Sequence, residues 1–210
     1  MYKDIHTHQS SINFSILNFH QDFESSTEID FCSLGIHPWY ISNLEIQLES
    51  LKRFAGNSNV IAIGECGLDK ECETPWDLQQ LAFIQQIKLA ERLNKPLIIH
   101  CVKAYDECLT LLTDVNVPVL FHGFNRKNTI AQKILEKGFY LSVGKAIFQT
   151  AFQEIFKKLP IEFIFFETDD NTSISIDEIY KKAAEVKNIE IDMLILQIEK
   201  NFKRVFKNER

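Results

Sequence analysis

Residues 60–100 read VIAIGECGLDKECETPWDLQQLAFIQQIKLAERLNKPLIIH. The apolar run at residues 60–64 predicts a buried strand, and the leucines and isoleucines of residues 76–93 recur near helical spacing. Pro96 then stops the helix, and the apolar run at residues 97–100 predicts the next strand. A strand, a helix and a second strand in this order are typical of parallel α/β folds.

The rest of the chain continues this alternation of short β-like runs and longer helical runs. Further strands are predicted at residues 2–5, 14–19, 31–36, 119–121, 139–143 and 162–167. Further helices are predicted at residues 44–54, 104–112, 129–136 and 151–158, with two more within residues 175–206. The resulting series of eight strands predicts an α/β fold, a distorted (β/α)8 TIM-like barrel. Because the gaps after the first two strands are too short for crossover helices, we expect shortened first crossovers.

Length and composition indicate a single barrel domain spanning residues 1–210. Of the 210 residues, 45% are hydrophobic and 17 are phenylalanine, which is enough to bury a sizeable core. The apolar runs are far too short to cross a bilayer, and the N-terminus lacks the basic and apolar pattern of a signal peptide. We therefore expect a cytoplasmic protein that does not bind a membrane.

Charge and cysteine content argue against several classes of site. Lys and Arg number 23 and Asp and Glu number 29, so the formal net charge is 23 minus 29, or −6. This charge provides no overall attraction to a polyanion, so any nucleic-acid binding has to be local. The five cysteines form an odd set without a CxxC spacing, which supports neither a disulfide framework nor a zinc ribbon. We interpret them as reduced, mostly buried thiols.

Several side chains with metal-binding chemistry stand at or near the C-terminal ends of predicted strands. They are His6, His8, Glu65, His100, His122 and Asp169. In a barrel of parallel strands these ends gather at one mouth, so ligands far apart in the sequence can share a metal ion. Four imidazoles and two carboxylates suffice for two cations with positions left open for water and substrate. The pattern predicts a two-metal hydrolase.

Each of these motifs also has an ordinary structural interpretation when it is taken alone. His6 and His8 lie two positions apart on an extended segment, so their side chains point the same way. They are either metal ligands or polar loop residues. Glu65 follows a buried strand, where it needs a cation or strong hydrogen-bond donors, or else caps a turn. Asp169 follows another apolar strand and either binds a metal or begins the next loop.

His100 and His122 each close an apolar run. One such histidine is an ordinary structural residue, but two of them beside the other four ligands favour a site. Cys101 follows His100 and is expected to face the opposite side of its strand, outside the site. Asp69 is either a helix N-cap or a partner of a metal ligand.

Motifs along nearly the whole chain resemble those of the TatD family of metal-dependent deoxyribonucleases, within the amidohydrolase-like metallohydrolases. In the family's order they are Asp4-Ile5-His6-Thr7-His8, Gly35-Ile36-His37-Pro38, Gly64-Glu65-Cys66-Gly67-Leu68-Asp69, Gln79 with Phe83 and Ala90, Pro96 to His100, His122-Gly123-Phe124, Glu167-Thr168-Asp169, and Asn201 with Val205-Phe206. The resemblance implies two divalent metal ions, with Mg or Mn favoured and Zn also compatible. It implies that one ion is held by His6, His8 and Asp169, the other by His100 and His122, and that Glu65 bridges both.

The activity implied by the resemblance is hydrolysis of phosphodiester bonds in DNA, at single strands or ends, by metal activation of water. Asp169 and Glu65 are the implied catalytic residues, and Asp169 would orient or deprotonate the water. The candidates for substrate binding are Lys103, Arg126, Lys145 and His37. The three cations are equally compatible with solvated surface charge, and no obligate protein partner is implied.

Two segments depart from the family's pattern. The segment between the first histidines and Gly35 is shorter than in typical relatives, and Asp169 is followed by residues 170–173, DNTS, instead of proline and an aromatic residue. These departures concern the substrate pocket more than the metal ligands. Two alternatives therefore stay open: a metallohydrolase of a small ester, amide or phosphate on the same scaffold, and a metal-binding scaffold with little turnover.

Overall fold

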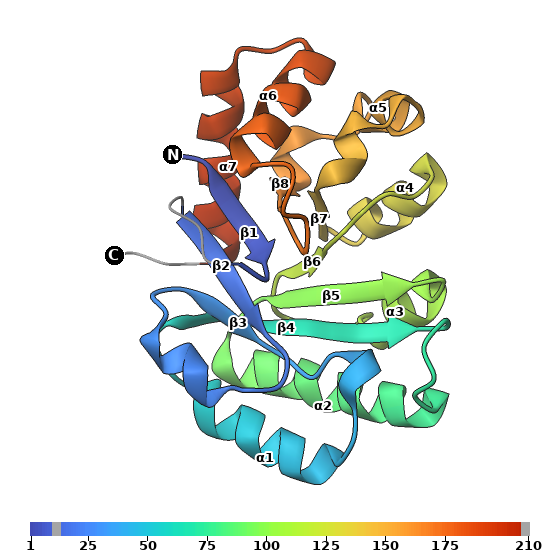
Figure 1. Ribbon diagram of the computed structural model, residues 1–210. Coiled ribbons are helices and arrows are strands. Elements are labelled where there is room, and N and C mark those ends of the chain that lie inside the picture. The colour runs from blue at the N-terminus through green and yellow to red at the C-terminus, as the bar shows by residue number, and fades with distance from the viewer. Residues whose placement is uncertain (10–13, 207–210) are drawn as a thin grey trace. The chain divides into compact units, whose positions relative to one another are not determined.

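A computed structural model of the chain describes residues 1–9 and 14–206 (Figure 1). Over these residues, eight strands follow one another in chain order in a single sheet. They are β1 (Lys3–Thr7), β2 (Phe14–Phe19), β3 (Cys32–Leu34), β4 (Val60–Asp69), β5 (Leu97–Val102), β6 (Val119–Phe121), β7 (Tyr140–Val143) and β8 (Ile164–Phe166). β1 lies next to β8, with a parallel bridge between Thr7 and Asp169. This strand order is that of the distorted (β/α)8 barrel predicted from the sequence.

The helices alternate with these strands. The α-helices are α1 (Leu44–Phe54), α2 (Trp76–Leu93), α3 (Tyr105–Leu111), α4 (Asn128–Glu136), α5 (Thr150–Phe156), α6 (Ile176–Lys187) and α7 (Ile191–Phe206), and the 3-10 helices are η1 (Glu24–Glu28), η2 (Pro38–Tyr40), η3 (Lys145–Phe148) and η4 (Ile161–Phe163). Both α1 and α2 begin and end at the predicted residues. Asn43 accepts a hydrogen bond from the backbone N–H of Ile46, at 3.2 Å, and so caps α1. Asn94 ends α2 in the left-handed conformation, with φ 51°.

The predicted shortening of the first crossovers is confirmed between β2 and β3, where η1 is the only helix. Between β1 and β2, residues 10–13 lie outside the described part of the chain. Apart from β4, the helices and strands that were predicted with definite bounds begin and end within two residues of those bounds.

β4 is longer than predicted, because it continues through Glu65 to Asp69 instead of ending at Gly64. Its register with β5 shifts between Ile63 and Cys66, after which pairing resumes. Gly67 pairs with His100 and has a φ of 148°, and a Cβ atom at Gly67 would collide with the carbonyl oxygen of His100. Glu65 therefore lies within a paired strand and not in a turn that follows it.

Contacts between Cα atoms divide the chain into two compact units. The terminal unit comprises Met1–Ile16 and Phe121–Arg210, and the central unit comprises Leu17–Leu120. In the central unit, α2 packs on β4 and α1 lies beside α2 (Figure 1). In the terminal unit, α6 and α7 pack against each other and both contact β8.

All five cysteines are free thiols, and only Cys72 is not buried. Burial raises the pKa of the Cys32 thiol to about 11 and raises the pKa of the Cys66 thiol further. The structure therefore confirms the interpretation of reduced, mostly buried cysteines. Within residues 1–9 and 14–206, every helix is too short or too polar to cross a membrane.

Candidate metal centre

In the terminal unit, β1 and the segment after β8 bring three of the predicted ligands together. The backbone N–H of Asp169 donates to the carbonyl oxygen of His6 at 3.0 Å, and that of His8 donates to the carbonyl oxygen of Asp169 at 3.1 Å. These bonds hold the Asp169 carboxylate beside both imidazoles. Its Oδ1 atom lies 3.7 Å from His6 Nε2 and 3.6 Å from His8 Nε2.

His122, which follows β6, joins this cluster. Its ring centroid lies 4.4 Å from that of His6. The donor atoms of His6, His122 and Asp169 all lie within 4.8 Å of one another. Two imidazoles and a carboxylate at this spacing fit a divalent cation of the Mn or Zn type. The terminal unit thus contains four of the six predicted ligands: His6, His8, His122 and Asp169.

Other buried polar groups support the terminal cluster. Asp4 on β1 accepts hydrogen bonds from the Thr168 N–H at 3.0 Å and from the Thr168 hydroxyl at 2.6 Å. Burial raises the pKa of the Asp4 carboxyl to about 7, against the lowering effect of these hydrogen bonds. Glu167 Oε1 accepts from the Gly123 N–H at 2.6 Å and lies 3.5 Å from His122 Nδ1. Within the described residues, Glu167 Oε2 has no hydrogen-bond partner.

In the central unit, Glu65 is the centre of a second cluster. Its side chain is buried, and its Oε1 atom lies 2.7 Å from His100 Nδ1 and 3.1 Å from His37 Nε2. Asn18 on β2 holds Glu65 from the other side, because its Oδ1 accepts from the Glu65 N–H at 2.9 Å. The donor atoms of His37, Glu65 and His100 all lie within 4.8 Å of one another. These residues also match the donor set of a divalent cation.

Asp69 completes the central cluster. Its Oδ2 atom lies 3.0 Å from His100 Nε2 and accepts from the indole N–H of Trp39 at 2.6 Å. Burial alone would raise the pKa of Asp69, but the hydrogen bonds from His100 and Trp39 outweigh it and lower the pKa to about 2. Of the two roles considered for Asp69, the structure therefore supports contact with His100, one of the predicted ligands. A carboxylate at a ligand imidazole fixes the orientation of the ring.

The predicted substrate-binding residues lie in different surroundings. Lys103 forms an ion pair with Glu71 on the surface. Lys145 lies 3.5 Å from Asp170. Arg126 is half-buried in the loop after β6. His37 belongs to the central donor set itself.

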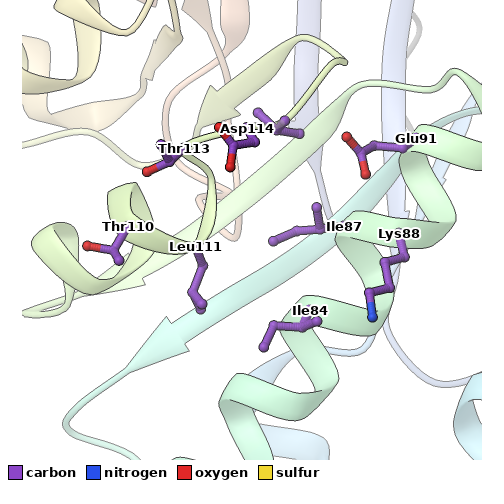
Figure 2. A pocket seen from close by; sticks show the side chains of 9 residues that line it. Ile84, Ile87, Lys88, Glu91, Thr110, Leu111, Thr113 and Asp114 are labelled. Atoms are coloured by element: carbon purple, nitrogen blue, oxygen red, sulfur yellow. The ribbon is translucent and has the colours of Figure 1, made fainter.

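A small cavity of about 90 Å³ adjoins the terminal cluster. It is lined by Gly123, Asn125, Gly144, Lys145, Ala146, Glu167, Thr168 and Asp169. Lys145 therefore shares a cavity with Asp169, one of the predicted ligands. A second cavity, of about 200 Å³ in the central unit, lies between α2 and the end of α3. Its lining contains none of the predicted site residues, and Figure 2 shows its side chains, including Ile84, Ile87 and Leu111.

Asn18, Trp39 and Glu167 were not predicted as parts of a site. Asn18 and Glu167 are polar residues in otherwise apolar β-like segments, and this pattern could have indicated a buried polar role. Trp39 directly follows the Gly-Ile-His-Pro motif, but no pattern in the sequence indicates that its indole meets Asp69. Contacts of this kind depend on the tertiary structure.

Comparison with known proteins identifies similar chains. Residues 5–207 match the family model described as TatD related DNase. An uncharacterized metal-dependent hydrolase of Buchnera aphidicola subsp. Baizongia pistaciae is 31% identical over 194 residues, covering 83% of this chain and 73% of that protein. The 3'-5' ssDNA/RNA exonuclease TatD of Shigella flexneri serotype 5b is 30% identical over 145 residues, covering 64% of this chain and 55% of that protein.

A solved structure has the same fold. The TatD homologue YjjV of Escherichia coli K12 superposes with a TM-score of 0.85 at 21% identity, over 99% of this chain and 98% of that chain. This likeness confirms the TIM-like barrel as the fold class.

Proposed function

Because the chain belongs to the TatD family of metal-dependent hydrolases, we propose that it hydrolyses phosphodiester bonds in single-stranded nucleic acid. The observation that carries the proposal is that each unit contains a donor set of two imidazoles and one carboxylate: His6, His122 and Asp169 in the terminal unit, and His37, Glu65 and His100 in the central unit. A relative of this chain is named as a 3'-5' exonuclease of single-stranded DNA and RNA, which supports nucleic acid as the substrate class.

The proposed metal ligands fall into the two sets described above. In the terminal unit they are His6, His8, His122 and Asp169, and in the central unit they are Glu65 and His100, with His37 beside them. We propose two divalent ions, with Mg or Mn as the activators and Zn as a compatible ion. Divalent ions bound to such donors lower the pKa of water and offset the negative charge of a phosphate.

We assign the role of proton acceptor to Asp169. Its side chain is about one-third exposed, at 35%, so water can reach the carboxylate. Its backbone is bound on both sides to β1, through the carbonyl oxygen of His6 and the N–H of His8. A carboxylate held in this way can take a proton from an attacking water without first changing its position.

We propose that only a few residues of the protein contact the phosphates of the substrate. Lys145 lines the small cavity that also contains Asp169, which supports Lys145 as a contact for a substrate phosphate. Lys145 lies 3.5 Å from Asp170, a looser ion pair than that of Lys103 with Glu71, so the charge of Lys145 is offset less. With a net charge of −6, the protein is better suited to single strands or ends than to a long duplex.

The test is cleavage of labelled single-stranded DNA and of bis-p-nitrophenyl phosphate by metal-stripped protein with Mg or Mn restored. We expect metal-dependent cleavage of both substrates that is lost in Asp169→Asn. The matched control is Asp114→Asn, which alters an exposed carboxylate at the cavity between α2 and α3, whose lining contains no predicted site residue, and should keep the activity. Cleavage of the small diester alone would indicate a metallohydrolase with another substrate. No turnover of any substrate would favour a metal-binding scaffold.

A further inference from the structure

Two neighbouring aromatic side chains are exposed on η2 in the central unit. Trp39 is 56% exposed and Tyr40 is 39% exposed. Two large rings exposed next to each other leave apolar area in contact with water, which is unfavourable. Exposed apolar area of this kind is typical of a binding site, because a bound ligand removes it from water.

The indole of Trp39 lies against the central donor set. Its ring centroid is 5.2 Å from that of His37 and 6.0 Å from that of His100. Its N–H donates to Asp69, whose carboxylate also contacts His100. A ligand that lies on this indole is therefore next to His37 and His100, the proposed metal ligands beside Trp39 in the central unit.

The backbone of η2 is held by side chains from several elements. The Trp39 N–H donates to His37 Nδ1 at 3.1 Å, the Pro38 carbonyl accepts from the Thr74 hydroxyl at 2.6 Å, and the Tyr40 carbonyl accepts from the Gln47 amide at 2.8 Å. The Tyr40 ring also stacks on His20, with centroids 4.5 Å apart and an angle of 17° between the rings. Rings that are fixed in advance lose little conformational entropy when they bind a flat ligand.

We propose that Trp39, with Tyr40 beside it, is a stacking platform for an unpaired nucleobase of the substrate strand. This inference rests on the proposed nuclease function and adds the part of the substrate that is recognised. Stacking suits this protein because it needs no basic surface and accepts every base, in keeping with the net charge of −6. A duplex would not fit the platform, since its bases are already stacked on each other.

The first test measures binding without turnover. Trp39 and Trp76 are the two tryptophans of the chain, so Trp76→Phe leaves Trp39 as the only indole that fluoresces. We expect a thymidine oligonucleotide to quench this fluorescence in EDTA, and an abasic oligonucleotide of equal length to leave it unchanged. Equal responses to the two strands, or no response to either, would overturn the platform. Because no metal is present, this result is independent of whether the protein is a nuclease.

The second test separates stacking from the hydrogen bond to Asp69. Both Trp39→Ala and Trp39→Phe lose the indole N–H, but only Trp39→Phe keeps an aromatic ring. For single-stranded DNA, we expect KM to rise about 10- to 100-fold in Trp39→Ala and less than about threefold in Trp39→Phe. With an abasic substrate the two variants should be equal. Leu81→Ala, which removes an exposed apolar side chain from α2, is the control and should keep the wild-type KM.

The kinetic outcomes have distinct meanings. Equal loss of kcat in both Trp39 variants on every substrate would overturn the platform and leave Trp39 as a positioning residue for Asp69. If the wild-type protein cleaves normal and abasic strands with the same KM, the platform is overturned but the proposed nuclease function stays intact.

Discussion

Glu65 is a buried carboxylate with polar partners at both of its oxygens. Burying an unpaired carboxylate is costly, but His37, His100 and Asn18 all lie at its two oxygens. In the central unit these contacts occupy the same atoms that a cation would use. A metal ion bound there would exchange hydrogen bonds for coordination bonds, and the fold would gain stability from the binding.

The first prediction is that Mn stabilises the protein through Glu65. An ion that binds only the folded chain adds about 2.7 kcal/mol at one hundred times its Kd, which corresponds to a rise in Tm of roughly 5–10 °C for a chain of this size. We expect this rise in the wild type and a clearly smaller rise in Glu65→Gln, which keeps only the donor set of the terminal unit, measured by thermal denaturation followed by circular dichroism. Glu154→Gln, at a surface ion pair, is the control. A full Mn shift in Glu65→Gln would remove Glu65 from the metal site.

α7 shows how one polar residue can attach a helix to a sheet. Its buried face carries Leu194, Ile198, Phe202 and Val205, which recur at helical spacing. Asn201 is also fully buried, and its amide donates to the carbonyl oxygens of Ile161 at 2.8 Å and Ile164 at 2.9 Å. These hydrogen bonds connect α7 to η4 and to the start of β8, the strand that leads to Asp169.

The second prediction is that Asn201→Ala destabilises the fold by about 2–3 kcal/mol. Two buried hydrogen bonds are lost, and the carbonyl oxygens of Ile161 and Ile164 lose the amide that donates to them. The measurement is urea denaturation followed by tryptophan fluorescence and circular dichroism. Leu196→Ala, at an exposed position of the same helix, should change the free energy of unfolding by less than about 0.5 kcal/mol. A loss no larger than that of Leu196→Ala would mean that the apolar face alone attaches α7.

The distribution of charge over the protein bears on how it can bind nucleic acid. The net charge is −6, and several cations near the candidate site are already paired, including Lys70 with Glu107, Lys103 with Glu71 and Lys145 with Asp170. A protein of this kind can neutralise only a few phosphates. Its affinity for a single strand therefore has to come mainly from the metal centre and from stacking.

The third prediction is a shallow dependence of binding on salt. With one or two phosphates neutralised, affinity for a thymidine oligonucleotide should fall less than about tenfold between 50 and 200 mM KCl, whereas six phosphate contacts would cost about 300-fold. Fluorescence anisotropy with Asp169→Asn, which should bind without cleavage, measures this change. A loss above about a hundredfold would reveal a basic channel that the charge distribution does not predict.

Sequence patterns alone determined most of the elements and the set of candidate ligands. The period of apolar residues is local, so α1 and α2 could be predicted to the residue and the strands other than β4 to within two positions. His6, His8, Glu65, His100, His122 and Asp169 could be chosen because each lies at or near the end of a strand as predicted from the sequence. That these residues bind metal, and that residues 1–210 form one domain, stay predictions.

Tertiary structure alone decided which groups meet. The continuation of β4 past Glu65 depends on its pairing with β5, which no local pattern contains. The contacts of Asp69 with His100 and Trp39, and the ion pair of Lys103 with Glu71, join residues about 30 positions apart. Periodicity reports which face of an element is buried, but hydrogen bonds and ion pairs depend on distances of a few ångströms that only the folded chain establishes.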